Sequence, residues 1–182
     1  GFVMTYSTLA AVVKYPRASS LAGGHGKFGF FASEAAAYEK IASELGIKRL
    51  SATGKPLLYA RHPLVYLMEA ADDICYEIMD IEDSHKLRIL TFDETRDLLL
   101  GFFDEEARKD ILERLADDGV TDENEQVVYF RACAVGKLEH ECVEALVANE
   151  DKILDGTFTG SLIDHIAEPQ REAYQRCVKT PY

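Results

Sequence analysis

Apolar residues recur along most of this chain at the three- and four-residue spacing of helices, and the period-two alternation of strands is nearly absent. Pro16 predicts the end of the first helix, Ser33 is a plausible N-cap, and Gly46 is a stop signal. The pattern therefore predicts an all-α fold, a multi-helix bundle. The predicted helices are 5–14, 33–45, 63–86, 92–103, 104–118, 123–148 and the tail, which has a weak break near residue 169.

The helix predicted over residues 63–86 has carboxylates beside its apolar residues. With Leu67 at the centre of the apolar arc and about 100° per residue, Asp72, Tyr76 and Asp80 fall at about 140°, 180° and 220°. They form a row on one side of the helix. A rise of 1.5 Å per residue separates Asp72 from Asp80 by about 12 Å, which suits an extended ligand. The alternative interpretation is a solvated acidic face.

Two further carboxylates, Asp73 and Glu77, fall at about 240° and 280°, on the side expected to face solvent. Asp72, in contrast, borders the apolar arc, which extends through Met68, Cys75 and Met79 on that side. An ionised carboxylate beside an apolar face is costly unless it is paired or binds a metal. Asp72 is therefore the better candidate for a ligand.

The connection over residues 16–32 is rich in glycine and is flanked by cations. Lys14, Tyr15, Arg17 and Lys27 lie in or beside it. Cations together with backbone N–H groups can bind phosphate, although neither GxxxxGK[ST] nor GxGxxG is present. The alternative is an ordinary surface loop.

Composition narrows the function classes. The net charge of −12 argues against non-specific binding of nucleic acid. The four cysteines show no metal-finger spacing, so we expect free, buried thiols in a reducing, cytoplasmic setting. No apolar run approaches the roughly 18 residues that span a bilayer, so no membrane partner is expected.

The run ARHPLVYLMEAADDICYEIMDIED (residues 60–83) strongly resembles the deoxyguanosine triphosphate (dGTP) triphosphohydrolase branch of the HD-domain phosphohydrolases. TLAAVVKYPR and KFGFFASE resemble upstream segments of the same family, in the same order. The resemblance implies the C-terminal portion of an HD-domain-type helical fold. Residues 1–90 would be a partial catalytic region and residues 91–182 a C-terminal helical region, packed as one unit.

The resemblance also implies roles for individual residues. A divalent metal, Mg²⁺ or Mn²⁺, would bind the first Asp of EAADD, and the Tyr and Asp of the row would contact the triphosphate and the sugar 3′-hydroxyl. The cations near the glycine-rich connection would bind phosphates. The implied assignments are Asp72 for the metal, Lys14, Tyr15, Lys27 and Tyr76 for phosphate, and Asp80 for the sugar.

The implied activity is hydrolysis of a deoxynucleoside triphosphate, dGTP first, to a deoxynucleoside and triphosphate, by a homo-oligomer. The family's other metal ligands, a His and a His-Asp pair, are expected N-terminal to residue 1, so we expect the isolated chain to be inactive. Two alternatives stay open. One is a non-catalytic helical oligomerisation or interaction module, centred on residues 104–182 with an interface on 123–148. The other is an HD-type phosphohydrolase with another phosphorylated substrate.

Overall fold

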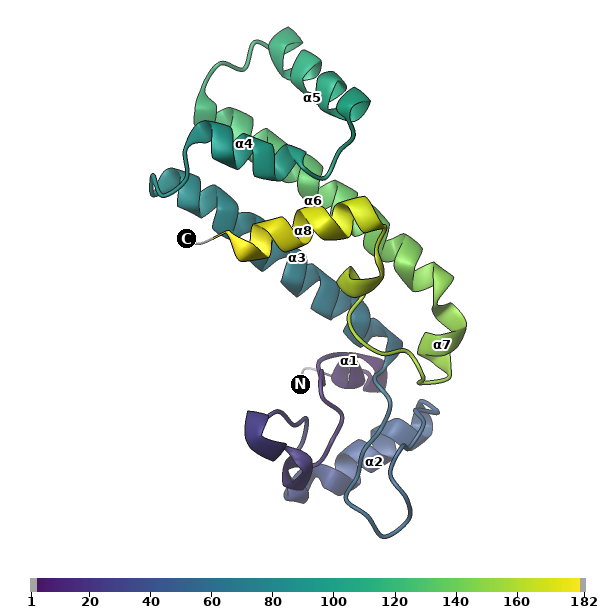
Figure 1. Ribbon diagram of the computed structural model, residues 1–182. Coiled ribbons are helices and arrows are strands. Elements are labelled where there is room, and N and C mark those ends of the chain that lie inside the picture. The colour runs from purple at the N-terminus through teal and green to yellow at the C-terminus, as the bar shows by residue number, and fades with distance from the viewer. Residues whose placement is uncertain (1–2, 181–182) are drawn as a thin grey trace. The chain divides into compact units, whose positions relative to one another are not determined.

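The computed structural model describes residues 3–180, and these form helices joined by turns and three isolated bridges, with no strand among them (Figure 1). The all-α prediction is confirmed. The chain divides into two compact units, one of residues 1–69 and 146–161, the other of residues 70–145 and 162–182. The predicted division into regions 1–90 and 91–182 stays a prediction.

The first unit contains α1 (Tyr6–Ala11), α2 (Ala35–Glu44), the first turns of α3 (Pro63–Lys86) and α7 (Glu150–Leu154). Between α1 and α2 lie three short 3₁₀ turns, η1 (Ser19–Leu21), η2 (Gly23–His25) and η3 (Ala32–Glu34). The predicted cap at Ser33 is wrong. The reason is that the turn before α2 is closed by the Glu34 carboxylate, which accepts a hydrogen bond from the Phe31 backbone N–H at 2.9 Å.

Aromatic packing forms a small core in the first unit. Phe30 stacks on Tyr38 with ring centroids 4.6 Å apart, and Tyr59 lies 5.5 Å from Tyr38. Isolated backbone β-bridges pair Ala18 with Phe30 and Arg17 with Leu58. These contacts fix residues 16–32 against residues 57–59, although the connection has few helical residues of its own.

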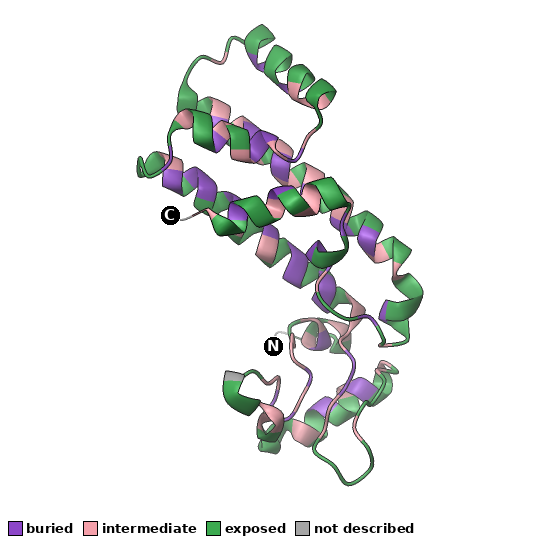
Figure 2. Ribbon diagram, viewed as in Figure 1, coloured by how far each residue is buried: buried purple, intermediate pink, exposed green. Residues whose placement is uncertain are grey.

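The second unit contains the rest of α3, then α4 (Phe92–Leu100), α5 (Glu105–Asp117), most of α6 (Glu123–Ala148), η4 (Ile163–His165) and α8 (Glu168–Lys179). The bounds of α3 and α6 match the predicted helices. Pro169 stands in the first turn of α8 rather than at a break, because proline is tolerated where helical N–H groups have no acceptor. Buried positions follow one side of each helix, as Figure 2 shows.

Polar contacts join the helices of the second unit around this apolar core. The buried Glu82 of α3 accepts from Arg131 of α6 at 2.5 Å and pairs with Lys86 at 2.6 Å. The Tyr174 hydroxyl of α8 donates to the Asp73 carbonyl of α3 at 3.2 Å. The Glu82 carboxylate and the Asp73 backbone carbonyl thus link α3 to its neighbours in this unit. None of the described helices has the length and apolar character needed to cross a membrane.

Candidate functional site

Three cations surround the ring of Tyr15 in the first unit. Lys27 Nζ lies 5.3 Å from the ring centroid, and the guanidinium carbons of Arg17 and Arg61 lie 5.8 and 5.9 Å from it. These distances are within the range of cation–π attraction. Together with Lys14, these side chains form what we call the basic cluster: Lys14, Tyr15, Arg17, Lys27 and Arg61.

One buried carboxylate anchors two members of the basic cluster. Glu69 is only 7% exposed. It accepts a hydrogen bond from Arg61 Nη1 at 2.7 Å and pairs with Lys14 Nζ at 3.2 Å. Arg61 Nε also donates to the Lys14 carbonyl at 3.1 Å. The carboxylate neutralises part of the charge but leaves the cluster with an excess of positive charge, in a chain whose net charge is −12.

A close backbone approach brings Lys27 to Tyr15. A Cβ on Gly29 would lie 2.4 Å from the Tyr15 carbonyl oxygen and 2.4 Å from Val13 Cγ1, so only glycine fits there. The Gly29 N–H donates to the Arg17 carbonyl at 3.0 Å. The glycine-rich connection therefore folds back on the segment that precedes it, and Lys27, two residues before Gly29, remains exposed.

The predicted row lies on the part of α3 that belongs to the second unit. Asp72, Tyr76 and Asp80 are all exposed, and Tyr76 is 69% exposed. Among residues 3–180, none of the three side chains makes a hydrogen bond or an ion pair. The structure thus brings Tyr15, Lys14 and Lys27 together in one unit and places the row in the other. The assigned roles of all six residues stay predictions.

The rotation of α3 differs from the predicted one. Leu67, placed at the centre of the apolar arc, is 40% exposed, and Met79 is 50% exposed. Asp73 and Glu77, expected to face solvent, are half-buried. Ile74, Ile78 and Ile81, which the predicted arc places within about 60° of Leu67, are buried as expected. Ala70 is also buried, so the buried side is shifted from Leu67 toward Asp73.

The cysteines are all free in the described structure, as predicted, but only two of them are buried. Cys142 and Cys177 are buried, Cys133 is half-buried, and Cys75 is exposed. The expectation of burial is wrong for Cys75 because of the same rotation of α3.

The metal expected at Asp72 needs more ligands than these residues offer. Mg²⁺ and Mn²⁺ bind through several oxygen ligands. Within residues 3–180, no three His, Cys, Asp or Glu side chains form a group that could hold a metal ion. Asp72 fits a metal site only as one ligand among others, so the expected cofactor stays a prediction.

Sequence reasoning left two residues of this site unassigned, Arg61 and Glu69. A glutamate on the buried side of a helix signals a cationic partner, because a buried carboxylate must be paired. The partners of Glu69 are Arg61, 8 positions earlier, and Lys14, 55 positions earlier. Helical periodicity does not identify either of them.

His62 has a structural role, since its Nδ1 accepts from the Leu64 N–H at 3.2 Å. Burial lowers the pKa of His62, in keeping with a neutral ring in that role.

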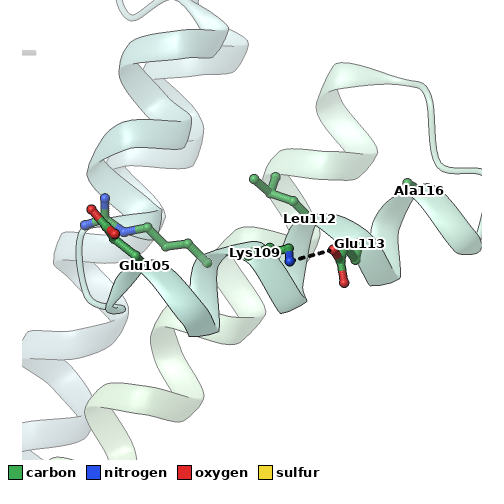
Figure 3. A pocket seen from close by; sticks show the side chains of 6 residues that line it. Glu105, Lys109, Leu112, Glu113 and Ala116 are labelled. Atoms are coloured by element: carbon green, nitrogen blue, oxygen red, sulfur yellow. Dashed lines mark ion pairs between the residues drawn. The ribbon is translucent and has the colours of Figure 1, made fainter.

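A hollow along α5 is a weaker candidate (Figure 3). All six residues that line it come from this one helix, and Lys109 and Glu113 pair across one turn at 3.6 Å. No second element of the described chain supplies a facing wall, so the hollow supports no binding site.

Comparison with known proteins places the chain among related sequences, although no family model matches it. It is 35% identical over 181 residues to a deoxyguanosinetriphosphate triphosphohydrolase-like protein of Pseudomonas aeruginosa, covering 97% of this chain and 39% of the relative. A protein of the same name from a Synechocystis species is 33% identical over 173 residues, covering 90% of this chain and 37% of that protein. The deoxyguanosinetriphosphate triphosphohydrolase of Serratia proteamaculans is 26% identical over 190 residues, covering 94% and 35%. The chain thus spans well under half the length of these curated relatives.

Proposed function

We propose, from the premise that this chain is homologous to the deoxyguanosinetriphosphate triphosphohydrolase-like proteins, that it forms part of a deoxynucleoside triphosphate triphosphohydrolase. The proposed reaction takes one water and one dGTP to deoxyguanosine and triphosphate. The bond broken joins the α-phosphorus to the 5′-oxygen, which leaves with a proton from the water.

The observation that supports this proposal best is the basic cluster. A triphosphate has several negative charges, and guanidinium and ammonium groups bind phosphate oxygens through charge-assisted hydrogen bonds. Lys27 is exposed beside Tyr15, and Glu69 fixes Lys14 and Arg61. In the proposed role these cations bind and orient the triphosphate and stabilise the charge that develops on it during hydrolysis.

The other assignments rest on the family resemblance. Tyr76 would add a contact to the triphosphate, and Asp80 would accept a hydrogen bond from the sugar 3′-hydroxyl. Asp72 would supply one ligand to a Mg²⁺ or Mn²⁺ ion, which as a Lewis acid helps to activate water. One carboxylate is a poor site for a divalent ion, so we propose that the isolated chain is inactive.

Calorimetric titration of the chain with dGTP and with inorganic triphosphate tests the role of the basic cluster. We expect both to bind, and Lys27→Gln to weaken both about tenfold, corresponding to loss of one charge-assisted contact of about 1.4 kcal/mol. Lys40→Gln on α2 is the matched control, because Lys40 is exposed and lies outside the cluster. Equal affinities of the wild-type and Lys27→Gln chains would count against the phosphate role.

The catalytic part of the proposal needs the longer protein. There, Asp72→Ala should abolish metal-dependent release of triphosphate from dGTP, while Asp83→Ala, an exposed carboxylate on the same helix, should leave it unchanged. Full activity of the Asp72→Ala protein would disprove the assignment of Asp72. Replacing dGTP with other deoxynucleoside triphosphates in the same assay separates a dGTPase from a phosphohydrolase of other specificity.

A non-catalytic helical interaction module is the second candidate function. The observation that favours it is the exposure of apolar side chains on α6, where Val128 is 40% exposed and Val143 is 49% exposed. A homo-oligomer with α6 in its interface would cover them. Sedimentation velocity should then show a larger species that Val143→Glu dissociates, and a monomer at all concentrations would argue against it.

A cytoplasmic location is proposed only from the free cysteines.

A further inference from the structure

A cavity of about 580 Å³ lies in the second unit, where the end of α4 and the start of α5 meet α6 and α8. Cavities of this size, roughly 300–1,000 Å³, hold small organic molecules. Arg108, Lys137 and Arg176 are among the residues that line it, together with the apolar side chains of Phe103 and Pro169.

Arg108 is oriented by the backbone at one wall of the cavity. Its Nε donates to the Leu100 carbonyl at 2.9 Å and to the Phe103 carbonyl at 2.8 Å. Leu100 is the last residue of α4 and Phe103 follows it, and carbonyl groups at the C-terminal end of a helix attract cations. Within the described chain the two terminal nitrogens of Arg108 have no hydrogen-bond partner, so each of them can donate to a ligand.

Arg176 of α8 lines the same cavity, and its guanidinium makes no hydrogen bond or ion pair with any residue that the structure describes. Its guanidinium lies close to the α4–α5 connection at Gly101. A Cβ on Gly101 would lie 3.1 Å from Arg176 Nη2. Arg108 and Arg176 therefore both lie along residues 100–103, one anchored to the backbone and the other packed against it.

The remaining polar groups of the cavity are largely engaged. Lys137 pairs with Glu141 at 2.9 Å, and Asp104 accepts from the Ala107 N–H at 2.8 Å as the cap of α5. Gln170 Nε2 donates to the Phe102 carbonyl at 3.1 Å. Glu172 is exposed. Lys137 keeps further N–H donors beside its ion pair, but the two guanidinium groups supply the donors whose geometry matches an oxyanion.

We propose that this cavity binds a small organic anion, with a carboxylate or phosphate group held by Arg108 and Arg176 and an apolar body against Phe103 and Pro169. A guanidinium group donates two parallel hydrogen bonds to either oxyanion, which favours this chemistry over a neutral ligand. A bare inorganic ion would leave most of the cavity empty. The inference does not depend on the proposed function, because it uses neither the basic cluster nor the row.

The proposal is tested by titrating the full 182-residue chain with benzoate and with phenyl phosphate. Calorimetry and the shifts of amide NMR signals measure the binding. The two probes have the same ring and different oxyanions, and benzyl alcohol is the neutral control. We expect saturable binding of at least one anion, with shifts at residues 100–108 and 170–176, and the tighter anion identifies the preferred class. Arg176→Gln should weaken binding about tenfold or more.

Lys179→Gln is the matched control, because Lys179 lies on the same helix, is exposed, and is outside the cavity lining. It should bind as the wild type does. Arg176→Gln removes no side-chain hydrogen bond or ion pair among the described residues, so its far-UV circular dichroism and unfolding midpoint should be close to those of the wild type. Three results would overturn the proposal: no saturable binding of either anion, equal affinity for benzyl alcohol, or unchanged affinity in Arg176→Gln.

Discussion

The Glu69 carboxylate accepts a hydrogen bond from Arg61 Nη1 at 2.7 Å, and the same buried carboxylate pairs with Lys14. One side chain of α3 thus holds two cations that are distant in sequence. Arg61 and Lys14 are partly exposed, with 22% and 30% of their side-chain surface open to solvent. Glu69 is the most buried of the three side chains. A buried carboxylate needs cationic partners, so the Glu69 charge is what holds Arg61 and Lys14 in place.

Replacing Glu69 with Gln should destabilise the chain by about 1–3 kcal/mol. Breaking a fully buried ion pair costs about 3–5 kcal/mol. The loss here should be smaller, because Lys14 and Arg61 reach solvent. Urea unfolding followed by circular dichroism measures the change. Glu39→Gln is the control, since Glu39 and its partner Arg49 are an exposed pair that should be worth well under about 1 kcal/mol. Equal effects of the two substitutions would contradict the anchoring role of Glu69.

Replacing Tyr38 with Phe should raise the free energy of unfolding by about 1 kcal/mol at neutral pH. The Tyr38 hydroxyl is buried and has no hydrogen-bond partner among the described residues, and an unsatisfied buried polar group is costly. Tyr66→Phe is the opposite case, because it removes the bond from the Tyr66 hydroxyl to the Phe158 carbonyl, 3.3 Å long. A loss of stability in Tyr38→Phe would show that its hydroxyl is satisfied in solution.

Tyr38 also predicts a dependence on alkaline pH. Burial, and to a smaller extent the nearby Tyr59, raises the pKa of Tyr38 to about 12. Its unfolded-state pKa is about 10, so the folded state favours the neutral hydroxyl. This contribution to stability is complete below pH 10 and is lost as the pH rises through 12, by roughly 2–3 kcal/mol. Unfolding titrations from pH 9 to 12 should show a flatter decline for Tyr38→Phe than for the wild type.

Replacing Gly156 with Ala should destabilise the first unit by about 2–4 kcal/mol. Gly156 has a φ of +75°, and a Cβ there would lie 2.6 Å from Ala60 Cβ, so backbone strain and overpacking add. At Gly119 φ is +69° but no atom lies within 4 Å, so Gly119→Ala should cost only about 1 kcal/mol. The double variant Ala60→Gly, Gly156→Ala should recover the overpacking part, and no recovery would exclude this contact as the cause.

Thiol labelling tests the rotation of α3. Cys75 is exposed, and burial raises the pKa of Cys142 to about 11 and of Cys177 to about 12. The native chain should therefore show one fast-reacting thiol with a disulfide reagent at pH 8. Cys75→Ser should abolish the fast phase, and Cys133→Ser should keep it. A native chain with no fast thiol would support the rotation expected from the apolar arc instead.

Local signals in the sequence were sufficient to predict the helices and to identify several residues of the basic cluster. The apolar spacing predicted α3 with its observed bounds, and the helix predicted over residues 104–118 is observed as α5. Lys14, Tyr15 and Lys27 were identified from a connection rich in glycine and cations. The structure brings these three residues together, and Arg61 joins them.

The tertiary structure alone decided how far the buried side of α3 is shifted from Leu67 toward Asp73. Apolar residues cover more than half of this helix, so periodicity permits several rotations, and the neighbouring elements select one. The sequence by itself determined where helices form, because propensity, caps and breakers act over a few residues. Only the fold decided that Glu69 is buried, since a carboxylate can leave water only where cations distant in sequence, here Lys14 and Arg61, come to meet it.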